Sequence, residues 1–240
     1  MLIDMHAHTK GISRCCRIDA PEMIEVAKEA GLDGVVLTNH YQKSYVQGDD
    51  ADAFAAGYVA EYHRATAEGR AQGMLVLFGV EVTMAKHAGA HVLIYGLSED
   101  FVLRYPALYD YTLPELYRLV SAEGGVLVQA HPLRGNKNAL LDTQYLSGIE
   151  ISCHPLYEGT HLDEISRIAR QTGLILTCGG DYHADTRRPR CGMYLPEDTV
   201  TGAALAAYLK TAPEVKLLVD EVDDLPPFTL TFQKNDAVLK

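Results

Sequence analysis

The chain has 240 residues, of which 48% are hydrophobic and 22% charged, and it carries a formal net charge of −11 at pH 7. This length suits one α/β barrel with a full buried core, so a single domain over residues 1–240 is expected. The acidic balance and the absence of any lysine and arginine run argue against binding to duplex nucleic acid or to an anionic membrane. They leave a small phosphorylated molecule as an acceptable partner.

The five cysteines follow no regular spacing and form no Cys-x-x-Cys pair: Cys15, Cys16, Cys153, Cys178 and Cys191. An odd number in such an arrangement predicts reduced thiols rather than a disulfide scaffold. The chain begins with a strand-like segment, and no stretch approaches the roughly 18 apolar residues of a membrane-spanning helix. A cytoplasmic protein is therefore expected, and the sequence does not indicate its oligomeric state.

The N-terminal half alternates short apolar runs with helical patterns. Asp19-Ala20-Pro21-Glu22 resembles a capping box, and the apolar stripe that follows it ends at Gly31. A long, alanine-rich polar helix follows, with Gly73 as its stop. The expected strands cover residues 2–5, 34–38, 74–82 and 91–97, and the expected helices cover about 19–31 and 51–72.

The C-terminal half continues the same alternation. Thr112-Leu113-Pro114-Glu115 starts a further helix, and Gly124-Gly125 ends it before the next strand. Strands are expected at 126–129, 148–152, 174–178, 215–219 and 228–232, and helices at 112–120, 162–171 and 199–210. This alternation predicts parallel strands joined by crossover helices.

Six of the ten histidines lie where a predicted strand gives way to a loop: His6, His8, His40, His91, His131 and His183. A lone histidine is usually a hydrogen-bonded packing residue, and we interpret the isolated His63, His87 and His161 in that way. His6 and His8 are two apart on one strand, so their side chains share a face. Neutral imidazole is a good ligand for borderline metals, so the pattern predicts a multinuclear metal site.

Two acids stand apart from the other carboxylates. Glu81 ends a hydrophobic strand, where burial without a cation or hydrogen bonds would be costly. Asp181 follows two glycines and precedes His183 by two residues. Each could form an ion pair with an arginine instead, but shared metal coordination is the better account because a carboxylate can bridge two cations.

Seven sequence pieces stand in one order: His6-Ala7-His8-Thr9, Gly31-Leu32-Asp33-Gly34 before Thr38-Asn39-His40, Gly79-Val80-Glu81, His91, Ala130-His131-Pro132, Gly148-Ile149-Glu150 and Gly180-Asp181-Tyr182-His183. In these pieces, over nearly its whole length, the chain resembles the polymerase-and-histidinol-phosphatase (PHP) family. The resemblance implies a distorted TIM-like (β/α)7 barrel with two or three divalent transition-metal ions at the carboxyl ends of the strands. Zinc, manganese and iron all suit such mixed ligands.

The resemblance also implies the ligands of each ion. The first ion would be held by His6, His8, Glu81 and Asp181. The second would be held by Glu81, His91 and His131, with a hydroxide between the two ions. A third would use His40 and His183.

The sequence departs from the family pattern at this third site. The acid or histidine expected a few residues after His8 is replaced by Ser13-Arg14-Cys15-Cys16, and the usual aspartate before His40 is Asn39. The third ion is therefore weakly held, completed by Cys15 or by a substrate oxygen, or missing. Alternatively, Arg14 supplies the missing positive charge through bidentate contacts with phosphate.

The expected activity is hydrolysis of a phosphoester in a small phosphorylated metabolite, either a histidinol-phosphate-like monoester or a short nucleotide diester. Arg134 is the best candidate for binding phosphate oxygens, followed by Arg14 and by the cluster Arg187, Arg188 and Arg190, although ordinary surface positions would explain them equally well. His154 follows a barrel strand, where it would touch substrate or donate a proton to the leaving oxygen.

Two other functions are compatible with the sequence. A metal-dependent amidohydrolase also opens with a His-x-His strand, but it usually bridges its metals with a lysine at a strand end, and none of the expected strands ends in one. A non-catalytic metal-binding module would predict decayed ligands, whereas eight are intact. The sequence does not choose between a monoester and a diester, nor among the metals.

Overall fold

We describe a computed structural model of the chain over residues 1–135, 139–184, 186–221 and 225–234. Its helices are α1 (Ala20–Glu29), α2 (Ala51–Gln72), α3 (Asp100–Arg104), α4 (Leu113–Ala122), α5 (Leu162–Thr172) and α6 (Gly202–Thr211). Its strands are β1 (Leu2–Ala7), β2 (Gly34–Leu37), β3 (His40–Tyr41), β4 (Leu75–Met84), β5 (Ala90–Tyr95), β6 (Val126–Gln129), β7 (Gly148–Ser152), β8 (Ile175–Gly179), β9 (Gly192–Tyr194), β10 (Glu214–Val219) and β11 (Phe228–Gln233).

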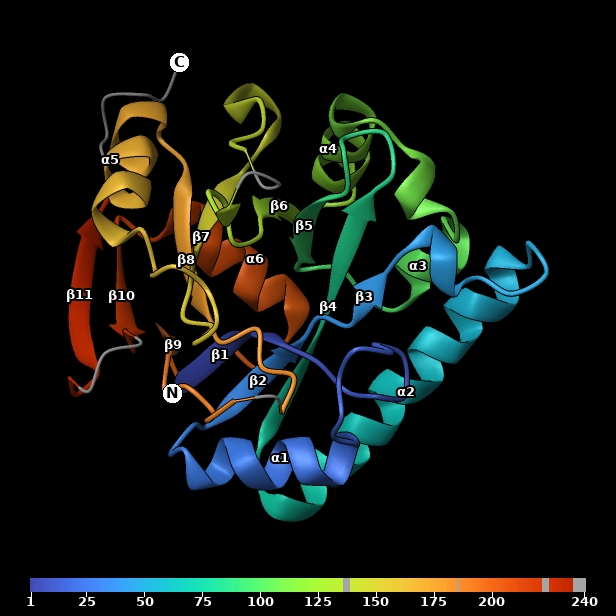
Figure 1. Cartoon of the computed structure of the whole chain (residues 1–240), viewed down its shortest axis with the longest axis horizontal. Coiled ribbons are helices and arrows are strands. Elements are labelled where there is room, and N and C mark those ends of the chain that lie inside the picture. The colour runs from blue at the N-terminus through green and yellow to red at the C-terminus, as the bar shows by residue number, and fades with distance from the viewer. Residues whose placement is uncertain (136–138, 185, 222–224, 235–240) are drawn as a thin grey trace.

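The strands form one sheet that curls into a nearly closed barrel (Figure 1). Their order is β11-β10-β9-β1-β2-β4-β5-β6-β7-β8, and β3 pairs with β4. The amide of Asp181, just after β8, donates to the carbonyl of His6 in β1, and a parallel bridge joins Ala7 to Tyr182. These contacts bring the last barrel strand back to the first, which confirms the expected distorted TIM-like α/β barrel.

Several strands run antiparallel, in contrast to the parallel arrangement expected from the sequence. β5 pairs antiparallel with both β4 and β6. Only residues 85–89 separate β4 from β5. A parallel connection needs a crossover of a dozen or more residues, so a link this short forces the antiparallel pairing. β9, which the sequence did not predict, pairs antiparallel with β1 and β10.

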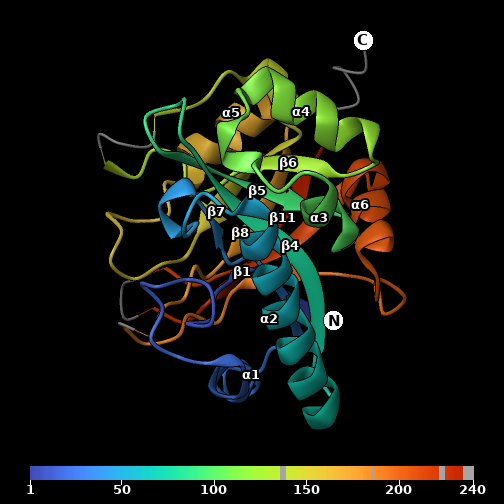
Figure 2. The same ribbon diagram turned by 90° about the vertical axis from the view of Figure 1, so that its right-hand side faces the viewer.

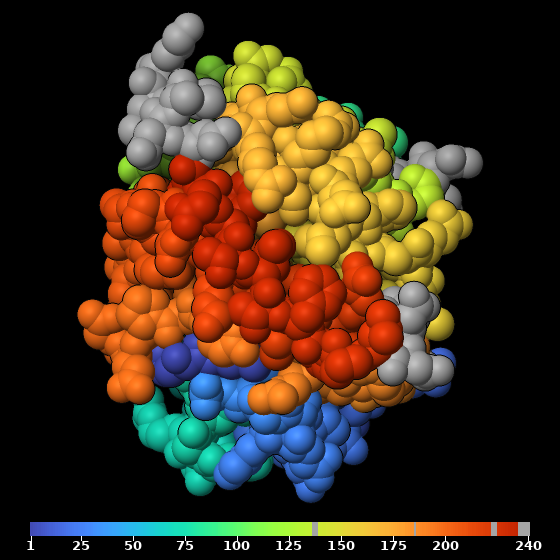
Figure 3. Space-filling model, turned by 90° about the vertical axis from the view of Figure 1, so that its left-hand side faces the viewer, coloured from blue at the N-terminus to red at the C-terminus, as the bar shows by residue number. Residues whose placement is uncertain are grey.

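The helices cover the outside of the sheet. Helix α1 begins with the predicted capping box, in which Asp19 accepts from the amide of Glu22 and Glu22 accepts from the amide of Asp19. Helices α1 and α2 lie together at one side of the barrel, and α4 lies at the other (Figures 1 and 2). The β10–β11 hairpin covers a third face between α5 and α1 (Figure 3). Among the described residues, no helix has the length and apolar character needed to cross a membrane.

Candidate metal centre

All eight predicted metal ligands meet at one end of the barrel. His6 lies in β1 and His8 just after it, while His40, Glu81 and His91 lie in β3, β4 and β5. His131 follows β6, and Asp181 and His183 follow β8. Residues separated by up to 177 positions therefore share one polar cluster, because the strands of a barrel end on a common rim.

Glu81 occupies the middle of this cluster and is completely buried. Its Oε1 atom lies 2.7 Å from His91 Nδ1 and 3.1 Å from His131 Nε2. Its Oε2 atom contacts His40 Nδ1 and lies 3.5 Å from His8 Nε2. One carboxylate therefore faces ligands of every predicted site, as a bridging group must.

The spacing of the first predicted quartet matches that of metal ligands. His6 Nε2 lies 3.4 Å from both Glu81 Oε1 and Asp181 Oδ1, and His8 Nε2 lies 3.1 Å from Asp181 Oδ1. With metal–nitrogen and metal–oxygen bonds near 2.0–2.1 Å, two ligand atoms of a tetrahedral ion are roughly 3.3 Å apart. The four side chains are thus already spaced to hold an ion.

Several buried ligand atoms face one another but make no well-directed hydrogen bond with any described residue: His6 Nε2, His8 Nε2, His40 Nδ1, Glu81 Oε2 and Asp181 Oδ1. A buried polar atom left unsatisfied costs roughly 1–3 kcal/mol, so five of them at one place require an explanation. Bound cations would satisfy all five. The donor set, imidazole nitrogens and carboxylate oxygens, suits zinc, iron or manganese.

Hydrogen bonds to neighbouring groups determine which ring nitrogen of His6 and of His183 is free to bind a metal. His6 Nδ1 donates to Glu150 Oε1 over 2.9 Å, and His183 Nδ1 donates to the carbonyl of Asp181 over 2.8 Å. In the neutral form that binds a metal, each of these two rings carries its one N–H on Nδ1 and keeps a lone pair on Nε2. Glu150 also accepts from the backbone amide of His131 at 2.8 Å, which places two ligands with one buried carboxylate.

Ser13 likewise determines which ring nitrogen of His8 is free to bind a metal. Its hydroxyl donates to Asn39 Oδ1 at 2.8 Å, so it accepts from His8 Nδ1 at 3.0 Å and from the amide of His40 at 3.0 Å. Asn39 accepts as well from the amide of Thr9. Two residues that depart from the family pattern therefore support the ligands instead of binding an ion.

The charges of the cluster keep its acids ionised. Burial alone would raise the pKa of Glu81, but His40, His91 and His6 hold it well below the usual value. Burial likewise opposes ionisation of Asp181, and His6 and His8 hold its pKa well below the usual value. Burial, together with His183 and His40, lowers the pKa of His8, so this histidine is neutral and ready to coordinate.

The backbone at two ligands adopts a conformation that side chains other than glycine rarely take. The φ angle is 26° at His131 and 47° at Asp181. Such strain costs about 1–3 kcal/mol and persists where the surrounding structure enforces it, most often at functional sites. A different constraint, lack of space, requires glycine at position 179, since a Cβ atom there would lie 2.4 Å from His6 Cβ.

Tyr157 is a site residue that the sequence analysis missed. Its hydroxyl donates to Asp181 Oδ2 and accepts from Arg134 Nη1 at 2.6 Å. The guanidinium of Arg134 lies 3.8 Å from the ring centroid of Tyr157, and His154 stacks on the same ring at 4.3 Å. The predicted residues Arg134 and His154 therefore do reach the centre, and Tyr157 links them to it.

The other arginines lie elsewhere. Arg187 forms a bidentate ion pair with the buried Asp220, and Arg188 lies 2.6 Å from the buried Asp4. Both side chains therefore neutralise buried carboxylates. Arg188 is itself buried, so its interpretation as a surface residue was wrong, whereas Arg187 is 54% exposed. Their role as phosphate ligands stays a prediction. Arg14 is exposed and donates to the carbonyls of Ser44 and Tyr45. Its role in catalysis stays a prediction.

Cys15 lies in the segment after β1, where His40 and His183 influence its ionisation. Its burial favours the neutral thiol, but these two histidines lower its pKa to about 6. The other four cysteines are buried, so Cys15 alone combines exposure with an electropositive surrounding, which is the setting of a reactive or metal-binding thiol.

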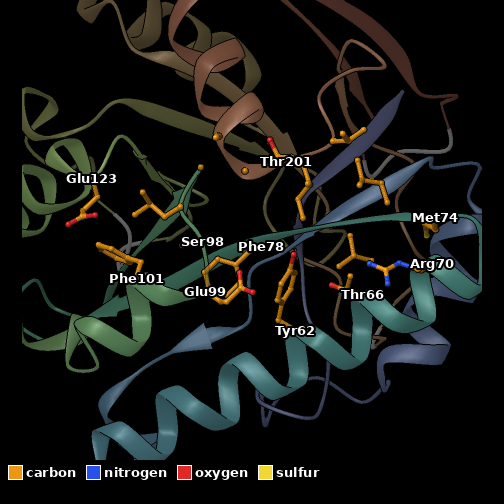
Figure 4. Close-up of a pocket in the computed structure, with 18 of the residues that line it drawn as sticks. Tyr62, Thr66, Arg70, Met74, Phe78, Ser98, Glu99, Phe101, Glu123 and Thr201 are labelled. Carbon is orange, nitrogen blue, oxygen red and sulfur yellow. The ribbon is translucent and has the colours of Figure 1, made fainter.

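Two larger cavities are candidate places for a substrate. One of about 320 Å³ is lined in part by Arg14, Tyr45 and Phe54, and the ring of Tyr45 lies 6.4 Å from the ring of His40. Another, of about 730 Å³, lies where β4 begins, and Tyr62, Phe78 and Thr201 contribute to its wall (Figure 4). None of the eight ligands lines either cavity. His131 instead lines a small space that also includes Arg134 and Tyr157.

No family model matches the chain, and none of the curated proteins compared with it does either. Solved structures share its fold. A two-domain protein from Bacteroides vulgatus, containing a predicted PHP-like metal-dependent phosphoesterase, matches with a TM-score of 0.58 and 17% identity over 91% of this chain. The chain spans 58% of that protein's length.

Two further structures extend the comparison. A predicted metal-dependent phosphoesterase from Bifidobacterium adolescentis has a TM-score of 0.55 and 18% identity, over 87% of this chain and 95% of that one. An amidohydrolase from Chromobacterium violaceum, with bound sulfate and no metal, has a TM-score of 0.54 and 17% identity, over 82% and 93% of the two chains. The chain therefore has the barrel fold of PHP-like metal-dependent phosphoesterases.

Proposed function

We propose that the chain hydrolyses a phosphoester in a small phosphorylated metabolite and uses two or three divalent transition-metal ions. The observation that supports this most strongly is the set of five buried ligand atoms around Glu81 and Asp181 that make no well-directed hydrogen bond with any described residue. When bound, ions at such a site lower the pKa of water toward neutrality and neutralise the oxygens of the phosphoryl group under attack.

The exposure of the ligands indicates how substrate reaches them. The side chains of Glu81, His6 and His8 are completely buried, whereas that of His91 is 22% exposed. The side chain of His183 is 11% exposed. We therefore place the phosphoryl group over the rim between these two histidines.

Three residues lie at this rim to bind and orient the phosphoryl group. Arg134 offers a guanidinium that can contact two oxygens at once, and Tyr157 offers a hydroxyl beside Asp181. His154 Nδ1 accepts from the amide of Leu156 at 3.1 Å, so the neutral ring carries its proton on Nε2. That proton is suitably held for donation to the leaving oxygen.

The organic part of the substrate fits the 320 Å³ cavity beside Arg14. Its wall includes the aromatic rings of Tyr45 and Phe54 and the side chain of Lys10. Such a space accepts a sugar, a heterocycle or an amino-alcohol attached to phosphate, as in a phosphomonoester or a short nucleotide diester. The net charge of −11 disfavours long polyanions.

Amide hydrolysis is the second candidate, favoured by the amidohydrolase among the structural neighbours. One experiment tests both. The protein is freed of metal, reloaded with zinc, manganese or iron, and assayed against phosphomonoesters, phosphodiesters and cyclic amides. We expect metal-dependent release of phosphate or alcohol from a phosphoester; turnover of amides alone would contradict the proposal.

A further inference from the structure

Three buried cysteines from separate segments lie together beside β8 and form a thiol cluster. Cys153 follows β7, Cys178 lies in β8, and Cys191 comes directly before β9. Their sulfur atoms all lie within 4.8 Å of one another, and the sulfurs of Cys153 and Cys178 are 3.6 Å apart. The fold therefore brings three soft metal-binding groups to one point.

The pairing of β7 with β8 places the thiol cluster on the face of the sheet away from the candidate metal centre. Glu150 in β7 faces inward, where it accepts from His6. The next residue, Ile151, points to the opposite face, and so does Cys178, which is its partner in β8. On that face β8 packs against β9 and β10 (Figure 1), and the thiol of Cys178 donates to the carbonyl of Leu218 at 3.3 Å. The thiol cluster thus shares no residue with the eight predicted ligands.

The sulfur atoms are spaced as ligands of one metal ion. With metal–sulfur bonds of about 2.3 Å, two sulfurs around a tetrahedral or trigonal ion lie roughly 3.8–4.0 Å apart. The 3.6 Å between Cys153 and Cys178 is close to this value, and no pair in the thiol cluster exceeds 4.8 Å. Hydrogen bonds with Cys178 and Cys191 also lower the pKa of Cys153, which favours the thiolate that a metal requires.

The number of sulfurs and their burial indicate which ion fits. Among the described residues the group has three members, all of them cysteines, and each is at most 1% exposed. Structural zinc takes four ligands, whereas three sulfurs complete a trigonal site for copper(I), an ion that thiolates select. Arg187, whose pKa is raised by Asp220 and further by Cys191 and Cys153, offsets part of the negative charge of the sulfurs.

We propose that Cys153, Cys178 and Cys191 form a trigonal binding site for copper(I), separate from the proposed catalytic metals. The ion joins the end of β7 and β8 to the start of β9, so it links the barrel wall to the antiparallel strands beside it. It stabilises the folded chain, because the three sulfurs meet only after these segments have assembled. The inference is independent of the proposed function.

X-ray absorption at the copper edge tests the site directly. The protein carries Cys15→Ser, so that the exposed thiol cannot bind copper, and zinc is added first to occupy the histidine cluster. Copper(I) is then added without oxygen for as long as the buried thiols of metal-free protein need to react completely with iodoacetamide, which ensures that they have become accessible. We expect one copper ion per chain, surrounded by three sulfurs and no nitrogen. Copper bound through nitrogen, or copper removed at once by a copper(I) chelator, would overturn the inference.

A matched pair of substitutions in the same background supplies the second readout. Cys191→Ser and Cys16→Ser each replace one buried cysteine, and Cys16 lies outside the thiol cluster. Cys191→Ser should lose the three-sulfur coordination and the rise in Tm that copper(I) produces, whereas Cys16→Ser should keep both. Circular dichroism checks the fold; if Cys191→Ser does not fold, the coordination measured in Cys15→Ser decides alone. A disulfide between Cys153 and Cys178 in place of bound copper, seen by mass spectrometry, would also contradict the metal site.

Discussion

Replacing Glu150 by glutamine probes how far the metal centre depends on residues that do not bind the metal. Glu150 is completely buried in β7 and accepts two hydrogen bonds, from His6 Nδ1 at 2.9 Å and from the amide of His131 at 2.8 Å. Glutamine has the same shape but offers one oxygen and one NH2 group. One of the two donors would then face another donor.

The size of the effect follows from these contacts. A hydrogen bond to a charged group contributes roughly 1.5–3 kcal/mol, and losing the partner that orients a metal-binding histidine lowers metal affinity roughly 10–100-fold. We expect Glu150→Gln to weaken zinc binding by about this factor. Turnover at saturating zinc should return to near the wild-type rate, because no ligand is removed.

Competition with a chelator of known affinity measures this change. Glu164→Gln in α5 is the matched control, since its side chain is 53% exposed and lies outside the metal centre. Zinc binding by Glu150→Gln as tight as that of the control would contradict this role of Glu150. Lost turnover with intact zinc affinity would instead assign Glu150 a part in the chemistry.

Four further outcomes are expected. Asp181→Asn should abolish phosphoester turnover while circular dichroism shows a retained fold, because the ligand lies on the rim and not in the core. Tyr157→Phe should lower kcat/KM for a phosphoester and leave the ion count unchanged; a changed ion count would place Tyr157 among the supports of the metals. Arg188→Ala should cost about 3–5 kcal/mol in chemical unfolding, because it leaves Asp4 charged and unpaired in the interior. Removing the metals with a chelator should lower Tm, and restoring them should recover it, because ligands that bind only the folded chain stabilise it.

Local patterns in the sequence predicted which histidines and acids cluster at the end of the barrel. His6 and His8 could be placed on one face because strand side chains alternate, and Glu81 stood out as an acid at the end of an apolar strand. The structure brings all of these together around Glu81. These residues are recognisable because each one ends a strand, and in a barrel the strands end on a common rim.

Contacts between distant segments could not be predicted in the same way. The Arg188–Asp4 pair joins residues 184 positions apart, and nothing near either residue indicates the other. Tyr157 lies in a loop without periodicity, so no pattern marked it. The antiparallel direction of β5 was also not predicted, because apolar periodicity identifies a strand but not its direction.

Glu81 and Asp181, the two buried carboxylates of the cluster, are expected to share the bound ions. The decisive measurement is the phosphoesterase rate of one preparation, followed as zinc, manganese or iron is added stepwise to the metal-free protein. We predict no turnover without metal, and a rate that rises until at least two ions per chain are bound. Equal rates in the metal-free and loaded protein, or no binding at millimolar metal, would contradict the assignment of Glu81 and Asp181 as ligands.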